Sequence, residues 1–343
     1  MQAFPFDIQN IAAAADKVPN LFDRVGQLVD FQDVRSPVTS VTLIRRDDEI
    51  TLLDPVAREA DRQELGGEEE LGLTFSVPSR KLGGKLSPTD IQNVVAFAPG
   101  PNQLRQQAEA YNRILLRLRR PHDITFEHIR MGAVKGVITN PRTGAVMYNL
   151  FDEFAIPKKV ITLDLTDENT NILEVTAEIA DHIGQNLFGE TASGIHALVR
   201  PGALTRLRTH PSYEKYILGH AAALEQLQAS RATVDGANNR RSLFIDGITF
   251  ESYSGKARNS RGEVVEFIED GAGHVFPTGT TDMFLDVDVP ANRMGETNTP
   301  PSEEIKMYPH ELEQAKGWDI DTESNKIAFC QRPEALVELD ILT

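Results

Sequence analysis

Apolar residues recur at every third or fourth position through residues 101–119, and this spacing predicts an amphipathic helix. Pro121 should end this helix, because a proline cannot donate the backbone hydrogen bond of a helix interior. A second helix is expected over residues 123–136, and a third over residues 172–187. Each of these helices has one apolar face that needs a surface to cover it.

Alternation of apolar and polar residues, the pattern of a half-buried strand, marks residues 71–77. Together with an apolar arm over residues 41–53, this strand would form a hairpin whose polar tip spans residues 58–70. A two-stranded ribbon of this length has too few neighbours to be stable alone in water. We therefore expect it to pack against another molecule, and the alternative is an ordinary hairpin in the core of a monomer.

Shorter apolar runs predict further strands. The clearest pair flanks Asp246-Gly247, a dipeptide that favours a type I′ turn. The C-terminal residues 335–341 alternate in the same way as the hairpin. Residues 1–40 differ, because their scattered apolar residues are interrupted by prolines. We expect this segment to be an arm that lies on another surface.

The composition of the 343 residues narrows the class of protein. Thirty-five basic and 51 acidic residues give a net charge of −16, which argues against a protein that grips the phosphates of DNA. The 40% of apolar residues is ordinary for a globular chain of about two domains. Cys330, the single cysteine, lies in an apolar run and should be a buried thiol rather than a nucleophile. No apolar stretch approaches the ~20 residues of a membrane span.

Motifs of enzymes are sparse in this sequence. The eight histidines include no pair at the spacing of a helical zinc site, and the phosphate-loop and nucleophile-elbow motifs are absent. His274, Asp282, Asp286 and Asp288 could together bind a divalent metal. Asp286 and Asp288 alternate with apolar residues, however, and this favours a half-exposed strand with solvated carboxylates. We therefore expect no catalytic residue, no metal and no cofactor.

Several motifs occur in an order and spacing that resemble one known family. Residues 126–136 run into residues 144–154, and His196-Ala197-Leu198 follows. Phe276-Pro277-Thr278-Gly279 comes next, and residues 330–337 complete the series. Over nearly the whole chain these motifs resemble the phage lambda-type major capsid proteins, the capsid protein E family.

The resemblance implies an α+β fold, the Hong Kong 97 phage capsid fold. That fold has an N-terminal arm, an extended β-hairpin loop, a peripheral domain with a long spine helix, and an axial domain. The corresponding parts of this chain would be the arm over residues 1–40, the extended loop over 41–92, the peripheral domain over 93–165, 243–256 and 317–343, and the axial domain over 166–242 and 257–316.

The resemblance also implies a structural protein that is not an enzyme, the major capsid protein of a tailed double-stranded DNA bacteriophage. Hexamers and pentamers of this homo-oligomer would build an icosahedral shell in the host cytoplasm and become the virion capsid. The expected partners are a portal protein, a scaffolding protein and optionally a decoration protein, with no membrane. Packaged double-stranded DNA would be held weakly, because the chain is acidic.

Assembly contacts would then be the functional residues. The predicted long helix carries the most basic stretch of the chain, and the hairpin tip of a neighbour carries acids that could pair with it. The candidate contacts are Arg117, Arg119, Arg120, Glu68, Glu69, Glu70 and Phe75. Two rival functions stay open: an encapsulin-like shell around a cargo, which would share the fold, and a metal-dependent hydrolase that would use His274 and the nearby carboxylates.

Overall fold

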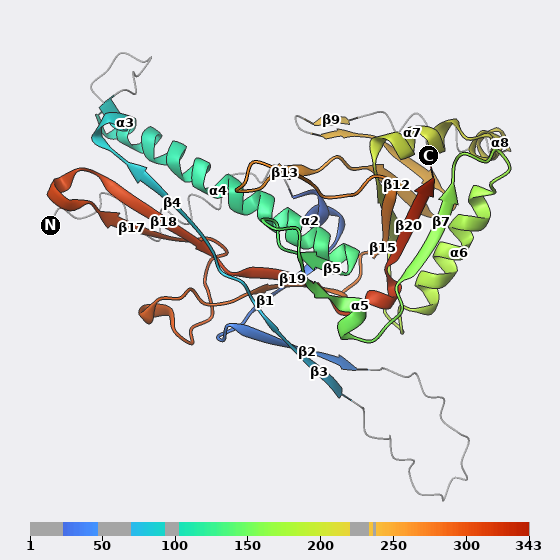
Figure 1. The fold of residues 1–343 in the computed structure, drawn as a ribbon, viewed down its shortest axis with the longest axis horizontal. Helices are drawn as coiled ribbons and strands as arrows, with labels where there is room; N and C mark the ends of the chain where they lie inside the picture. The colour runs from blue at the N-terminus through green and yellow to red at the C-terminus, as the bar shows by residue number, and fades with distance from the viewer. Residues whose placement is uncertain (1–22, 47–69, 93–102, 220–232, 236–237, 343) are drawn as a thin grey trace, which may run out of the picture.

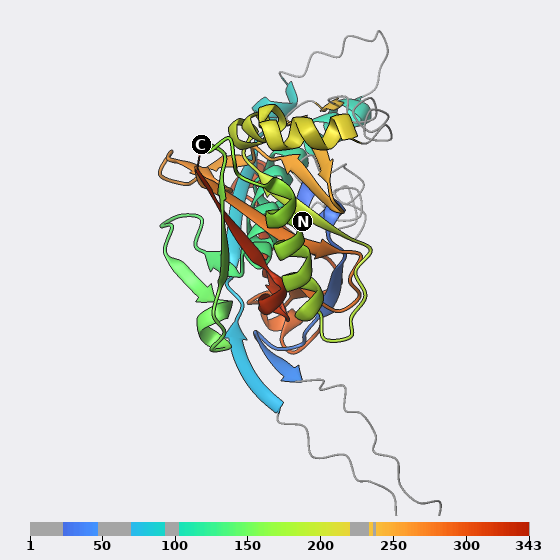
Figure 2. The same ribbon diagram turned by 90° about the vertical axis from the view of Figure 1, so that its right-hand side faces the viewer.

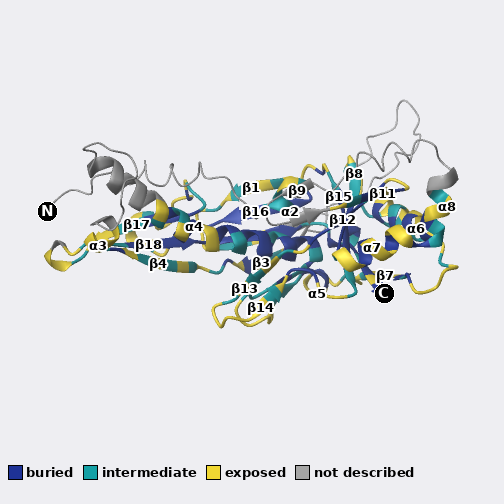
Figure 3. Ribbon diagram, turned by 90° about the horizontal axis from the view of Figure 1, so that it is seen from above, coloured by how far each residue is buried: buried dark blue, intermediate teal, exposed yellow. Residues whose placement is uncertain are grey.

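The computed structural model describes residues 23–46, 70–92, 103–219, 233–235 and 238–342. Helices and strands are mixed along the chain, as an α+β fold requires. Figure 1 shows two regions side by side: a sheet flanked by helices around the C-terminus, and an elongated region along the longest helix. Seen from above, the body is thin for its length, and its buried residues lie along the middle (Figure 3).

A six-stranded mixed sheet organises the region around the C-terminus, with the strand order β11-β12-β8-β15-β20-β7. The pairs β12–β8 and β20–β7 are parallel, and the other neighbours are antiparallel. Helices α6 and α7 pack on this sheet, and α8 packs on both helices. The bounds are β7 (Lys159–Asp164), β8 (Gly194–Val199), β11 (Ser242–Ile245), β12 (Ile248–Ser252), β15 (Ala272–Thr278), β20 (Val337–Leu342), α6 (Ile172–Gln185), α7 (Pro201–Thr209) and α8 (Pro211–Gly219).

Local sequence explains where these elements begin and turn. Asp246 and Gly247 both have positive φ angles, as a type I′ turn between β11 and β12 requires. The side chain of Asn171 caps α6 by accepting a hydrogen bond from the N–H of Leu173 at 3.2 Å. The predicted tight hairpin and the predicted third helix are therefore confirmed.

The longest helix, α4 (Gln103–Lys135), runs through the elongated region. The prediction that Pro121 would separate two helices is wrong, because this proline lies inside α4. Leu115 before it and Phe126 after it are both buried in the same hydrophobic core. Burial on both sides of the proline therefore outweighs the loss of one backbone hydrogen bond.

Two three-stranded sheets accompany α4, with the orders β17-β18-β4 and β1-β16-β19. Strand β4 approaches the helix at Gly84, where an added Cβ would lie 3.0 Å from the side chain of Leu118. A glycine therefore permits the close contact of strand and helix. The bounds are β1 (Phe31–Arg35), β4 (Arg80–Leu86), β16 (Phe284–Asp288), β17 (Lys306–Glu311), β18 (Trp318–Ser324) and β19 (Lys326–Cys330).

The predicted hairpin is confirmed at its base. Strand β2 (Ser40–Arg46) pairs antiparallel with β3 (Glu70–Ser76), which places Val41 opposite Phe75. Figure 2 shows both strands projecting away from the body. Of the predicted tip, residues 58–69 lie outside the described residues.

Short elements complete the described chain. They are α2 (Arg24–Leu28), α3 (Pro88–Gln92), α5 (Leu150–Glu153), the paired strands β5 (Val137–Thr139) and β6 (Val146–Asn149), β9 (Thr233–Asp235) and β10 (Asn238–Arg240), β13 (Lys256–Arg258) and β14 (Val264–Glu266), and three 3₁₀ segments at Met294–Glu296, Glu313–Ala315 and Pro333–Ala335.

Strands from the ranges predicted for the peripheral and the axial domain pair with one another in the six-stranded sheet. Strand β20 and the β11–β12 hairpin lie in the ranges predicted for the peripheral domain, and β15 and β8 in those predicted for the axial domain; β20 pairs with β15, and β12 pairs with β8. The reason is the apolar face of β20, where Leu339 and Ile341 lie in one core with Ile179 of α6. The C-terminal strand therefore belongs to the sheet that α6 covers.

Candidate assembly surface

The base of the hairpin is anchored in its own chain by one apolar face. Leu43 of β2 and Phe75 of β3 are both buried in the core that also contains Phe329. The rings of Phe75 and Phe329 lie 4.8 Å apart, and Tyr148 meets Phe75 edge-on at 5.1 Å. Alternation sends these side chains to one face and leaves polar residues on the other. Phe75 thus stabilises the hairpin from inside its own subunit and has no surface to offer a neighbour.

The second face of the hairpin base is polar and exposed. Thr42 and Thr74 lie opposite each other, with their hydroxyl oxygens 3.1 Å apart. The hydroxyl of Tyr148 donates to the carbonyl of Ser76 at 2.9 Å and accepts from its N–H at 3.1 Å. This pair of bonds fixes the strand where it leaves the body, so the direction of the projecting ribbon is set by the core.

The segment before the hairpin is also tied to the body. The guanidinium of Arg24 donates to the carboxylate of Glu251 at 2.7 Å, and the N–H of Val25 donates to Glu127 at 3.1 Å. The Arg24 and His196 side chains beside Glu251 outweigh its burial and lower its pKa to about 2. This carboxylate is therefore charged at neutral pH and holds α2 on the body.

A buried network of ion pairs lies beneath this attachment. Arg130 of α4 forms ion pairs with Asp23 and with Asp286 of β16, the latter at 2.6 Å. Lys326 of β19 lies 3.0 Å from Asp286 and 2.5 Å from Glu304. Each charge in the network has an opposite partner, which offsets the cost of taking it out of water. The network joins Asp23, α4, β16 and β19.

The prediction of solvated carboxylates at Asp286 and Asp288 is wrong. Only 3% and 1% of their surfaces are exposed. Strand β16 lies between β1 and β19, and all five of its residues are buried, so both of its faces are covered. Burial raises the pKa of Asp288 to about 7, although Lys326 and Lys306 act against this shift.

The candidate metal ligands do not come together. His274 is buried in β15, while Asp282 is exposed in the loop before β16. Within the part of the chain that the structure describes, no group of three or more His, Cys, Asp or Glu side chains could hold a metal ion.

The described helices include none that is long and apolar enough to cross a membrane. Cys330 is buried, as predicted, and burial raises the pKa of its thiol.

The projecting hairpin, the anchored segment before it and the long helix occur here on a chain whose sequence matches one family profile, described as "Phage major capsid protein E", over residues 7–341. The chain belongs to this family. The predicted resemblance is therefore confirmed.

Two curated relatives support the assignment to the capsid protein E family. The major capsid protein of Salmonella phage Felix O1 is 27% identical, covering 97% of this chain and 96% of the relative. The major capsid protein of Pseudomonas phage KPP10 is also 27% identical, with the same coverage of both chains. A crystal structure described as the capsid protein of an Escherichia coli CFT073 prophage covers 99% of this chain with a TM-score of 0.61 and 13% identity. That similarity confirms the predicted capsid fold.

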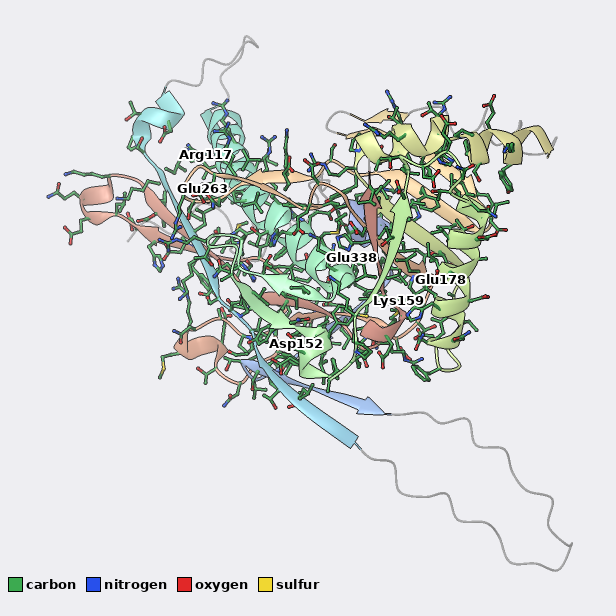
Figure 4. The ribbon with its side chains drawn as sticks, turned by 45° about the vertical axis from the view of Figure 1, so that its right-hand side comes forward. Arg117, Asp152, Lys159, Glu178, Glu263 and Glu338 are labelled. Atoms are coloured by element: carbon green, nitrogen blue, oxygen red, sulfur yellow. The ribbon has the colours of Figure 1, made fainter. Side chains whose placement is uncertain are left out.

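The candidate contacts of this capsid protein E family member fall into separate groups. Arg117 and Arg120 are exposed on α4. Arg119 is buried and lies 3.5 Å from Asp123, so it faces its own subunit and not a neighbour. Figure 4 shows Arg117 on the opposite side of the body from the hairpin. Arg117 therefore lies away from the described base of the hairpin in its own chain.

The acidic candidates lie at the edge of the described chain. Glu68 and Glu69 are outside the described residues, and the backbone of Glu70 pairs with Arg46 at the far end of the ribbon. The network around Arg130 was not predicted from the sequence. The signal in the sequence for this network was the pair Asp286 and Asp288 inside an apolar strand, since buried carboxylates require buried cations.

Proposed function

We propose that many copies of this chain assemble into an icosahedral shell that encloses the double-stranded DNA of a tailed phage. The observation that supports this proposal best is the hairpin β2–β3, which leaves the body as a ribbon of two strands (Figure 2). Such a ribbon is marginal in water by itself. A neighbouring subunit would cover it, and the same contact repeated around a closed shell would give high stability from a modest interface.

The thin shape of the body suits the wall of a container. Figure 3 shows buried residues along the middle of the molecule and exposed residues along both broad sides. One side would face the packaged DNA and the other the medium. The net charge of −16 disfavours tight binding of the inner wall to the phosphates of DNA. The DNA is therefore held weakly and can move during packaging and release.

Hexamers and pentamers are the subunit groups that such a shell requires, with a portal protein at one vertex. A separate scaffolding protein would guide assembly in the host cytoplasm, and a decoration protein could bind the finished virion capsid. Between subunits, we assign Arg117 and Arg120 to contacts with the acidic residues 68–70 of a neighbour's hairpin. Opposite charge at both sites supports this pairing.

Electron microscopy of the purified chain tests the proposal. We expect closed shells of uniform diameter from the full chain, and only small oligomers when residues 47–69 are replaced by Asn-Gly. The shortened chain should keep its thermal unfolding transition, because the base of the hairpin is anchored through Phe75 and Tyr148. Small particles of a few subunits from the full chain, under all conditions and with scaffolding protein present, would contradict the proposal.

A further inference from the structure

The loop after α6 carries an aromatic side chain on an unfavourable backbone. The N–H of Glu190 donates to the carbonyl of Leu187 at 3.1 Å, which closes a tight turn around Phe188 and Gly189. Both central residues have positive φ angles, +48° and +85°, the pattern of a type I′ turn. Glycine, asparagine and aspartate dominate these positions, because a bulky side chain is crowded at positive φ. Phe188 is therefore a strained residue.

A second turn in the same chain has nearly the same backbone but a residue that suits it. At Asp246 and Gly247, between β11 and β12, the φ angles are +46° and +86°. Turn chemistry would therefore favour aspartate or asparagine at position 188 as well. Phe188 is the one aromatic residue among the described non-glycine residues with positive φ, and the others are Ala155, Asp246, Asn298 and Gln314.

Burial within its own chain does not explain the phenylalanine either. As much as 45% of the surface of Phe188 is exposed, whereas Phe75 at the base of the hairpin is 2% exposed. An aromatic side chain stabilises a fold in proportion to the apolar surface that it removes from water. A large part of that contribution is therefore unused at Phe188 in the single chain.

The body holds this strained turn in place. The guanidinium of Arg332, between β19 and β20, donates to the carbonyl of Leu187 and lies 3.6 Å from the carboxylate of Glu190. The same carboxylate accepts a hydrogen bond from the N–H of Asp282 at 2.9 Å. These contacts fix both ends of the turn and so maintain the strain at its centre. Phe188 is thus presented to solvent in a fixed position, which lowers the entropy cost of binding a partner.

We propose that Phe188 is an anchor residue for the contact with a neighbouring copy of the chain. The inference rests on the proposed function, because the partner is a second subunit of the shell. Figures 1 and 2 show the end of α6 that leads into the turn on the side of the body from which the hairpin leaves. A neighbour that covers the hairpin would therefore approach the turn as well. Copies with a net charge of −16 repel one another, so their association depends on local contacts, to which rigidly held aromatic residues contribute most.

Phe188→Asn separates the role of the ring from that of the turn. Asparagine suits the turn, so the unfolding temperature of the single chain should equal or exceed that of the wild type. The yield of shells should fall at least about tenfold, since the loss of the ring is repeated at every subunit. Asp246→Asn, at the same position of the other turn, is the matched control and should assemble as the wild type does. Wild-type yields from Phe188→Asn would overturn the inference, and so would a lower unfolding temperature, because the ring would then stabilise its own subunit.

Crosslinking in assembled shells identifies the partner of Phe188. A phenylalanine that bears a benzophenone group would replace it and be activated by light in shells mixed from ¹⁴N- and ¹⁵N-labelled chains. We expect a crosslinked peptide that contains position 188 and joins two chains. Crosslinks within one chain only, or none in intact shells, would overturn the inference while the shells themselves still support the proposed function. Failure of the wild-type chain to form shells would instead overturn the proposed function.

Discussion

Glu127 of α4 accepts a hydrogen bond from the hydroxyl of Tyr253 at 2.8 Å, deep in the core. The same carboxylate accepts a hydrogen bond from the N–H of Val25, so it joins α4 to α2 and to the segment after β12. Burial raises the pKa of Glu127 to about 7, although these two hydrogen bonds oppose the shift. The attachment of α2 therefore depends on a carboxyl group that changes its protonation near neutral pH.

Glu127→Gln should change the pH dependence of stability. The folded pKa of about 7 lies above the unfolded value of 4.5, so ionisation of Glu127 destabilises the folded chain as the pH rises between these values. The glutamine variant lacks this penalty. Its free energy of unfolding relative to the wild type should therefore increase from pH 5 to pH 8, by roughly 1 to 3 kcal/mol. Urea unfolding at several pH values measures the difference, and a constant difference would refute the assignment.

Arg130→Met should be strongly destabilising. The substitution leaves Asp286 buried with Lys326 as its remaining cation and removes the partner of Asp23. Loss of one member of a buried ion pair costs about 3 to 5 kcal/mol. Arg142→Ala, at an exposed turn, is the control and should change stability by less than about 0.5 kcal/mol. Equal effects of the two substitutions in a thermal melt would show that the network contributes little.

Gly136→Ala and Gly144→Ala separate backbone strain from packing. Both glycines have φ near +70°, so alanine is strained at either position. A Cβ at Gly136 would lie 2.5 Å from the ring of Phe151, whereas nothing lies within 4 Å of a Cβ at Gly144. Gly136→Ala should therefore cost about 1 to 3 kcal/mol more than Gly144→Ala. Equal losses of stability by denaturant titration would mean that the ring moves away at little cost.

Charge reversal on α4 tests the contact between subunits. Arg117→Glu with Arg120→Glu should lower the yield of shells and reverse its dependence on salt, because attraction to a neighbour's hairpin becomes a repulsion that salt screens. Folding of the single chain should be unchanged, since both side chains are exposed. Combining this variant with lysines at residues 68–70 should restore assembly. Light scattering at several salt concentrations follows the result, and an unchanged salt response would exclude this pairing.

Period-two and turn signals predicted their elements correctly because these signals are local. The Asp246-Gly247 turn and the strand at residues 71–77 were both predictable, since the backbone of each follows from adjacent residues. The position of Pro121 inside α4 was not predictable. Its cost there is offset by core packing with distant residues such as Phe329, which the neighbouring sequence does not reveal.

The site was less predictable than the fold. Asp286 and Asp288 alternate with apolar residues, and the same pattern fits an exposed face or a buried one. Burial of Asp286 is possible because Arg130 and Lys326, which are distant in the chain, form ion pairs with it. Arg119 shows the opposite case: a basic residue between two exposed arginines turns inward to Asp123.

The position of β20 affects the order in which the protein can be made. This strand lies between β15 and β7, although it follows both of them in the chain. During synthesis the six-stranded sheet therefore remains open until residues 337–342 have left the ribosome. A chain that stops earlier leaves the edges of β15 and β7 unpaired and lacks the apolar side chains that meet α6. Such a fragment could not present a finished surface to other subunits, so the topology itself would keep incomplete products out of the assembly.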